Sequence, residues 1–224
     1  MSPPSIRNQS TRQSRGGTKF LSVAIATAWL ASIAVGFGIL LRYSAASGDA
    51  AGAPERWPLE SGLQRADGIC TLVLFAHPRC PCTRSSLEQL DRIAARELPL
   101  QVEVVFFVPE DQAEAWAHTD LWETAAAIPG VGVRADPGGK EAQRFGARTS
   151  GQALVYDPSG GLRLQGGLTP ARGHVGDSVL EAQLVDLVRG NPVVGVAPVF
   201  GCRLLDSPDS PAVSDVRDLP IEPQ

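Results

Sequence analysis

A strand-to-helix turn that carries two cysteines constrains this chain more than any other feature of its sequence. The apolar run 71–75 is typical of a buried strand, and residues 85–93 have the apolar spacing of a helix. Cys80, Pro81 and Cys82 lie between these two elements. Proline suits the first helical position because the N–H that it lacks has no partner there, and this places Cys80 at or beside the N-cap.

The start of a helix gives such thiols their chemistry. Unpaired amides and the positive end of the helix dipole lower the pKa of a thiol there, and Arg84 and His77 add positive charge nearby. Two roles are open for Thr83, which either donates its hydroxyl to the Cys80 thiolate or caps the helix through its own backbone bonds. The turn therefore predicts an exposed, accessible thiolate, the form that attacks disulfides or binds a soft metal.

A sequence signature connects this turn with a known group of proteins. Phe75, Pro78, Cys80 and Arg84 have the spacing of the signature F-x-x-P-x-C-x-x-C-R, and on these residues the chain resembles membrane-anchored TlpA/ResA-type thioredoxins. The longer motif H-P-x-C-P-C-T-R is similar to that of the thioredoxin-like RedB group. The resemblance spans residues 65–202 and implies an α/β thioredoxin-like fold, in which a central mixed sheet is flanked by helices. The implied reaction is thiol–disulfide exchange with protein disulfides or dithiols.

The chain departs from that signature at two positions. Thr83 stands where the family has its second cysteine, and the extra thiol is Cys82, so the motif reads Cys-Pro-Cys-Thr. Counting back from Asp157, Gly151 takes the position where the family places a cis-proline facing the redox cysteine. A glycine there permits close approach by a substrate backbone, but it forms a less rigid wall.

Two roles are open for Cys82. A bond to Cys80 closes a short, strained and readily reduced ring, whereas attack on a mixed disulfide at Cys80 makes Cys82 the resolving thiol. We predict thiol–disulfide exchange through Cys80 with Cys82 as resolving partner, and we expect no cofactor. The alternative is a copper(I) chaperone that uses the same cysteines and His77, although a histidine beside a turn is more often a hydrogen-bonded surface group. A peroxidase with Cys80 as its sole reactive thiol is a weaker third hypothesis.

The other two cysteines and one loop have less defined roles. Cys70 opens a core strand and is interpreted as a buried small hydrophobe. Cys202 is either a partner for another cysteine or a free thiol, and a bond between Cys70 and Cys202 would be purely structural. In a thioredoxin fold the loop 169–177 borders the redox cysteine, so Arg172 and His174 either contact substrate or are solvated.

The N-terminal part of the chain predicts a membrane anchor. Residues 20–41 carry no charge and span about 33 Å as a helix, enough to cross a bilayer. Basic residues precede this segment, whereas Arg42 alone follows it closely, so we expect the N-terminus in the cytoplasm and a periplasmic domain on a single-pass inner-membrane anchor. A basic end beside a membrane segment does not predict nucleic-acid binding. A cleaved signal peptide is the other interpretation, which Ser44-Ala45-Ala46 keeps open.

Composition sets the remaining domain boundaries. A chain of 224 residues with 43% apolar and 20% charged residues buries one ordinary core with residues left over. The polar residues 1–19 and the Pro- and Asp-rich residues 203–224 are expected to be disordered tails. Small residues in 42–56 predict a linker, which leaves 57–202 for the thioredoxin-like domain.

Periodicity and turn residues predict the order of elements within that domain. A strand, a helix and a second strand form a right-handed βαβ unit with parallel strands. A helix broken near residue 119, a short strand, a short helix, a hairpin and a last helix capped by Asp177 follow, and the chain from 192 onward is irregular. The predicted ranges are 69–75, 81–96, 100–108, 111–127, 131–135, 140–145, 152–156, 161–164 and 178–189.

Overall fold

The computed structural model describes residues 15–49 and 52–205 of the chain. Most residues of the two predicted disordered tails lie outside the described residues. The prediction is wrong at 15–19, which begin the first helix, and at 203–205, where Arg203 bridges Thr149. The chain divides into two compact units, Met1–Ser44 and Ala45–Gln224.

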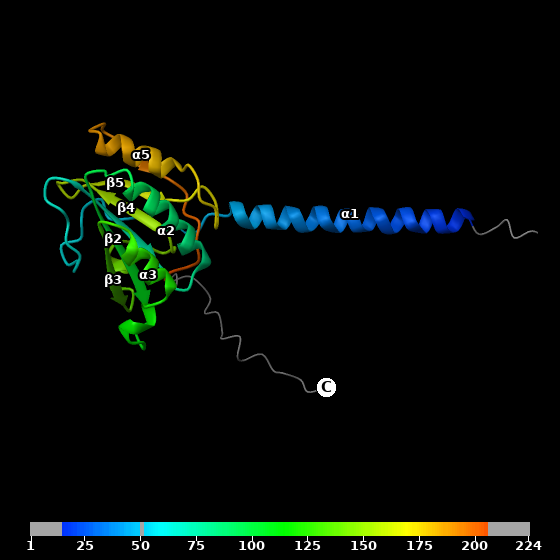
Figure 1. Ribbon diagram of the computed structural model, residues 1–224, viewed down its shortest axis with the longest axis horizontal. Helices are drawn as coiled ribbons and strands as arrows, with labels where there is room; N and C mark the ends of the chain where they lie inside the picture. Colours follow the sequence, from blue (N-terminus) through cyan, green and yellow to red (C-terminus); the bar gives the residue numbers. More distant parts are fainter. Residues whose placement is uncertain (1–14, 50–51, 206–224) are drawn as a thin grey trace, which may run out of the picture. The chain divides into compact units, whose positions relative to one another are not determined.

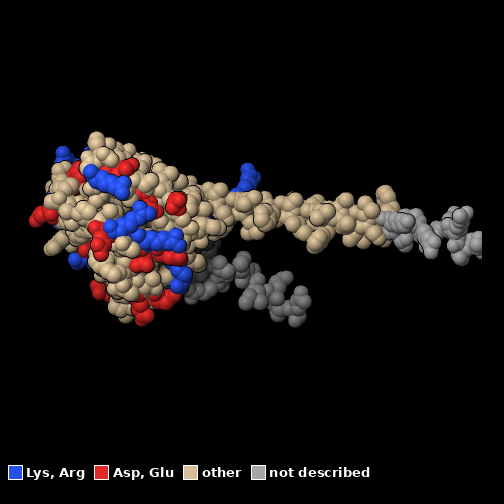
Figure 2. Space-filling view, turned by 45° about the horizontal axis from the view of Figure 1, so that its top comes forward, with Lys and Arg blue, Asp and Glu red and all other residues tan. Residues whose placement is uncertain are grey.

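A single long helix dominates the first unit. Helix α1 (Arg15–Ala45) contains the stretch Phe20–Ala45, which is long and apolar enough to cross a membrane by length and composition. Large apolar side chains around it are exposed, among them Phe20 and Trp29. Figure 2 shows almost no charged surface along this helix. The length and apolar composition of this helix are compatible with the predicted single-pass anchor.

The second unit is built on a six-stranded mixed sheet in the order β3-β2-β1-β4-β5-β6. The β1–β2, β2–β3 and β5–β6 pairs are parallel, and the β1–β4 and β4–β5 pairs are antiparallel. The predicted parallel βαβ unit and the predicted hairpin are both confirmed. The strands are β1 (Cys70–Ala76), β2 (Leu100–Val108), β3 (Val131–Pro137), β4 (Gln152–Tyr156), β5 (Leu162–Gly167) and β6 (Gly195–Val196).

Helices cover both faces of this sheet, with α2, α3 and α5 on one face and α4 on the other. Figure 1 shows α2 and α3 side by side against the strands. The break predicted near residue 119 is present, since a 3₁₀ helix ends before α3 begins. The helices are α2 (Pro81–Ala94), the 3₁₀ helix η1 (Glu114–Ala117), α3 (Asp120–Ala127), α4 (Lys140–Arg144) and α5 (Val179–Val188).

Strand β1 lies in the middle of the sheet and is buried on both faces. Leu72 and Leu74 pack into the cluster beneath α2, α3 and α5, whereas Val73 and Phe75 pack into the cluster beneath α4. None of these four side chains is exposed to solvent. This two-sided burial explains the nearly continuous apolar run that marks the strand in the sequence. The strand ends next to Cys80, so the core fixes where the cysteine turn begins.

The segment 42–56, predicted as a linker, contributes contacts to the second unit. The Gly48 amide donates to the Val199 carbonyl oxygen at 2.7 Å. The Tyr156 hydroxyl donates to the Pro54 carbonyl oxygen at 3.1 Å. Ordered backbone therefore begins ahead of residue 57, because small side chains let this segment lie against the domain.

Two local predictions differ from the structure. Ser178 rather than Asp177 caps α5, and its Oγ accepts a hydrogen bond from the Glu181 amide at 3.2 Å. Both residue types are good caps, so composition alone did not decide between neighbours. Residues 195–196 form β6 where irregular chain was predicted, because so short a strand leaves no periodic signal in the sequence.

Replacing Leu72 by alanine tests the central position of β1. Leu72 is fully buried, so Leu72→Ala should lower the free energy of unfolding by about 2–5 kcal/mol. Urea denaturation of the detergent-solubilised full chain, followed by tryptophan fluorescence, measures the change. Leu59 is fully exposed, and the control Leu59→Ala should change stability by less than about 0.5 kcal/mol. Equal effects of the two substitutions would contradict the assigned core.

Candidate functional site: a group of three cysteines

Cys80 occupies the N-cap of α2, four residues after β1 ends at Ala76. Pro81 follows at the start of the helix, as the sequence predicts. The Cys80 amide donates to the His77 carbonyl oxygen at 3.2 Å, and the Thr83 amide donates to the Cys80 carbonyl oxygen at 3.0 Å. These turn bonds leave the Cys80 side chain at the mouth of the helix, where the dipole favours an anion.

Three thiols meet at this point of the fold. The ligand atoms of Cys80, Cys82 and Cys202 all lie within 4.8 Å of one another, and the four cysteines of the chain are free thiols. The Sγ atoms of Cys80 and Cys202 share a hydrogen bond of 2.7 Å. We call Cys80, Cys82 and Cys202 the thiol group. Cys70 lies in the hydrophobic core instead, which agrees with its interpretation as a buried hydrophobe and leaves no Cys70–Cys202 bond.

The sequence analysis expects an accessible thiol at the helix start, and this expectation is wrong. Cys80 is only 2% exposed and Cys82 only 7% exposed. Cys202 is half-buried and lies against Cys80. The cover comes from a segment more than a hundred residues downstream, so the local sequence around the turn contains no sign of it.

The environment of Cys80 favours its ionised form. Burial raises the pKa of the Cys80 thiol, but hydrogen bonds from the Cys202 thiol and from the backbone amides of Cys82 and Thr83 outweigh it and lower the pKa below its ordinary value. The helix-start amides therefore act as the sequence predicts. The hydrogen bond from Cys202 is an addition that the sequence did not predict.

The other two thiols are held in the protonated form. Burial raises the pKa of Cys82, and the charge of Cys80 raises it further, whereas Arg172 lowers it. Burial, the hydrogen bond with Cys80 and the charges of Cys80 and Cys82 raise the pKa of Cys202 to about 12. With Cys80 ionised, the shared proton therefore lies on Cys202. When Cys80 ionises, the group therefore holds one thiolate and two thiols.

Arg172 connects the loop before α5 with the thiol group. Its guanidinium donates to the Gly201 carbonyl oxygen at 2.6 Å and lowers the pKa of both Cys82 and Cys202. The sequence analysis left this arginine either in contact with substrate or solvated. His174 is exposed, and its Nδ1 lies 2.8 Å from the Arg172 carbonyl oxygen.

A buried hydroxyl pair fixes the turn before Cys80. Thr83 Oγ1 donates to the His77 carbonyl oxygen at 3.0 Å and lies 2.9 Å from Ser150 Oγ. Ser150 Oγ accepts from the His77 amide at 2.9 Å, so its own hydrogen is directed to Thr83. The Thr83 hydroxyl therefore neither donates to the Cys80 thiolate nor caps α2, which were the two predicted roles. Instead, the Thr83 hydroxyl links the turn to Ser150, just before β4.

His77 lies outside the thiol group. Its Nδ1 accepts a hydrogen bond from the Arg79 amide at 3.1 Å, and its ring lies 5.6 Å from the Trp116 ring. Burial and the charge of Arg79 lower the pKa of His77. The third soft atom beside Cys80 and Cys82 is thus the sulfur of Cys202 rather than an imidazole nitrogen.

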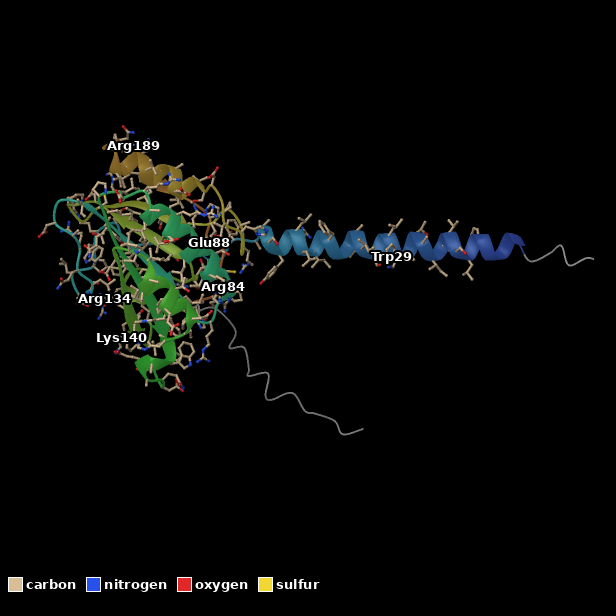
Figure 3. All side chains as sticks on the ribbon, viewed as in Figure 1. Trp29, Arg84, Glu88, Arg134, Lys140 and Arg189 are labelled. Atoms are coloured by element: carbon tan, nitrogen blue, oxygen red, sulfur yellow. The ribbon has the colours of Figure 1, made fainter. Side chains whose placement is uncertain are left out.

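Gly151 and Arg84 flank the site. Gly151 has a φ of 91° and donates its amide to the Phe75 carbonyl oxygen at 2.7 Å. A β-carbon there would lie 2.9 Å from Ser86 Oγ, so both conformation and space favour glycine. Arg84 projects from α2 (Figure 3) and forms an exposed ion pair with Asp120. Its charge is therefore directed to Asp120, which lowers the pKa of that carboxyl group.

Comparisons with known proteins agree with the fold. No protein-family model and no curated protein matches the chain. An uncharacterized conserved protein from Geobacillus kaustophilus is similar in structure, with a TM-score of 0.53 and 17% identity over 74% of this chain and 94% of its own. A second similar structure is an exposed lipoprotein thioredoxin of Streptococcus pneumoniae, with a TM-score of 0.41 and 20% identity over 55% of this chain and 86% of its own. A third is a secreted disulfide oxidoreductase of Mycobacterium tuberculosis, with a TM-score of 0.38 and 14% identity over 55% of this chain and 83% of its own.

The predicted fold class is confirmed. The second unit is an α/β domain with a central mixed sheet flanked by helices, and an apolar helix that could cross a membrane precedes it. The structural neighbours include thioredoxin-like proteins and a disulfide oxidoreductase. The similarity to the Geobacillus kaustophilus protein, at 17% identity, concerns the fold alone.

Replacing Cys80 by alanine tests the proton arrangement in the thiol group. The Cys80 charge and hydrogen bond contribute to the raised pKa of Cys202, so Cys80→Ala should lower this pKa from about 12. Iodoacetamide alkylation of Cys202 in the reduced chain, followed against pH by mass spectrometry, should show its midpoint at lower pH. Cys70→Ala serves as the control and should leave the midpoint in place. An unchanged midpoint in Cys80→Ala would show that the two sulfurs do not share a proton.

Proposed function

We propose that this chain is a membrane-anchored, extracytoplasmic thioredoxin-like protein that carries out thiol–disulfide exchange through Cys80. The observation that carries this proposal is the lowered pKa of Cys80 within hydrogen-bonding distance of a second thiol. A thiolate is the form that attacks disulfides, and an adjacent thiol completes the exchange. The proposed partners are protein disulfides or dithiols.

The proposed reaction has two steps. The Cys80 thiolate attacks one sulfur of a substrate disulfide, which forms a mixed disulfide and releases the other substrate sulfur as a thiolate. A second thiol of the group then loses its proton and attacks Cys80 Sγ, which releases the rest of the substrate. Two electrons pass from the thiol group to the substrate. The sequence assigns the second step to Cys82, and the reverse sequence of steps would oxidise a substrate dithiol.

The proposed location is a single-pass inner-membrane anchor with the domain in the periplasm. Support comes from the apolar stretch Phe20–Ala45 and from the basic residues that precede it. An extracytoplasmic compartment also permits the disulfide states that the reaction requires.

Copper(I) binding is a second candidate function. It is favoured by the three sulfur atoms within 4.8 Å of one another, because thiolates are the ligands that copper(I) prefers. In this version Cys202 replaces His77 as the third ligand. Against it stands the raised pKa of Cys82 and Cys202, since both thiols must lose their protons to bind a metal.

Replacing Cys80 by serine tests the proposed exchange. Cys80→Ser removes the attacking sulfur, so reduction of insulin disulfides by the full chain with dithiothreitol should fall to the rate without protein. The control Cys70→Ala keeps the thiol group and should retain the wild-type rate. If Cys80→Ser kept the wild-type rate, the exchange would not use this sulfur. A wild-type chain that reduces no insulin but binds one copper(I) ion would favour the second candidate.

Protease accessibility tests the proposed location. In a Gram-negative host, the chain should stay in the membrane after an alkaline wash, because its apolar helix spans the bilayer. Protease added to spheroplasts should then remove the domain and leave α1 with the N-terminal residues protected. A domain that is protected in spheroplasts would reverse the proposed orientation, and a chain processed after Ala46 would show that the helix is a cleaved signal.

A further inference from the structure

The segment that carries Cys202 is held in place over the thiol group by backbone hydrogen bonds. The Ser150 amide donates to the Cys202 carbonyl oxygen at 2.8 Å, and the Leu204 amide donates to the Arg148 carbonyl oxygen at 2.7 Å. The residues between these two bonds, Thr149 and Arg203, form an antiparallel bridge. Cys202 is therefore presented to Cys80 by a chain segment that pairs with residues 148–150.

The residue before Cys202 is adapted to this close approach. A β-carbon at Gly201 would overlap the Ser150 carbonyl oxygen, so only glycine allows the segment to lie so near. The Gly201 carbonyl oxygen accepts a hydrogen bond from Arg172. The charge of Arg172 also lowers the pKa of Cys202. The backbone pairing with residues 148–150 and the Arg172 contact thus both fix the position of Cys202.

We propose that Cys202, and not Cys82, is the thiol that resolves the mixed disulfide on Cys80, so that the oxidised form of the protein contains a Cys80–Cys202 disulfide. This inference rests on the proposed exchange function. It corrects the sequence-based assignment of the second step and makes Cys202 a catalytic residue.

Geometry favours Cys202 over Cys82 as the partner of Cys80. The two sulfurs of Cys80 and Cys202 are 2.7 Å apart, close to the length of about 2.05 Å that a disulfide bond requires. Cys82 lies two residues after Cys80, which is the extended N-cap residue, and its Sγ also interacts with Cys80 Sγ, within 4.8 Å. A Cys80–Cys82 bond would close a very small ring, whereas Cys80 and Cys202 join segments that are 122 residues apart.

Charge orders the two steps. While Cys80 is a thiolate, it helps to raise the pKa of Cys202 to about 12 and keeps Cys202 protonated. Once Cys80 is bound in a mixed disulfide, its charge and its hydrogen bond are gone, whereas Arg172 still lowers the pKa of Cys202. The Cys202 proton passes to the first substrate thiolate or to water. The Cys202 thiolate then attacks Cys80 Sγ, and the second substrate sulfur leaves with the electron pair of the broken bond.

The same arrangement explains why Cys80 is buried. The segment that covers Cys80 carries the second reactant, so it has to move aside for the substrate and return for the resolving step. Its anchors are backbone bonds at 148–150 and the Arg172 contact rather than core packing of Cys202 itself. Val199, Phe200 and Leu204 on either side of Cys202 are buried, so opening of this segment also exposes apolar side chains.

Disulfide mapping of the wild-type full chain tests this inference directly. Trypsin cleaves after Arg79 and Arg84 and after Arg189 and Arg203, so Cys80 and Cys82 share one peptide and Cys202 lies in another. After oxidation by one equivalent of oxidised glutathione and alkylation, these two peptides should be linked. An unlinked Cys202 peptide and an internal bond between Cys80 and Cys82 would overturn the inference. This measurement needs no substitution and does not depend on the folding of a variant.

Matched cysteine variants separate the two thiols kinetically. Cys202→Ser should lower the rate of insulin reduction at least about tenfold and should accumulate a glutathione adduct on Cys80, because the resolving thiol is absent. Cys82→Ser should keep the rate within about threefold and still link Cys80 to Cys202. An adduct that accumulates in Cys82→Ser but not in Cys202→Ser would overturn the inference while leaving the exchange function intact. Wild-type chain that neither reduces insulin nor reacts with glutathione at Cys80 would instead contradict the proposed function itself.

Discussion

The site depends on one electrostatic arrangement, a sulfur anion placed where a helix offers its unpaired amides. Burial alone would keep the Cys80 thiol protonated, and the hydrogen bonds from two helix-start amides and from Cys202 reverse that preference. The rest of the thiol group follows from this charge. It helps to raise the pKa of Cys82 and of Cys202, so ionisation of Cys80 favours the protonated form of the other two thiols.

The fold brings this arrangement about by fixing the end of one strand. Strand β1 is buried on both faces in the middle of the sheet, so the turn that follows it has little freedom. The antiparallel neighbour β4 begins beside that turn, and Ser150 and Thr83 join the two through their hydroxyl groups. The same start of β4 provides the backbone that pairs with the Cys202 segment. Residues from three distant parts of the chain thus lie together at the end of the central strand β1.

The features that could be predicted from sequence are those that local physics decides. The apolar run of β1, the proline at the first position of α2 and the spacing of its apolar residues all indicate their own elements, and the structure has them where expected. The position of Cys80 at the N-cap follows in the same way. A lowered pKa at Cys80 is indicated in part, because the local amides of Cys82 and Thr83 contribute to it, but the larger contribution comes from Cys202, far along the chain. The exposure of Cys80, by contrast, was predicted from its neighbours and is wrong.

By itself, the sequence determined the elements, the fold class, the apolar N-terminal helix and a reactive cysteine at a helix start, because periodicity, turn residues and capping act over a few residues. Only the tertiary structure decided which sulfur faces Cys80. Cys202 and Cys82 differ by 120 positions in the chain, and sequence proximity suggested Cys82, whereas long-range backbone pairing places Cys202 in contact. That pairing depends on Gly201 and on the start of β4, and no local pattern in the sequence connects them.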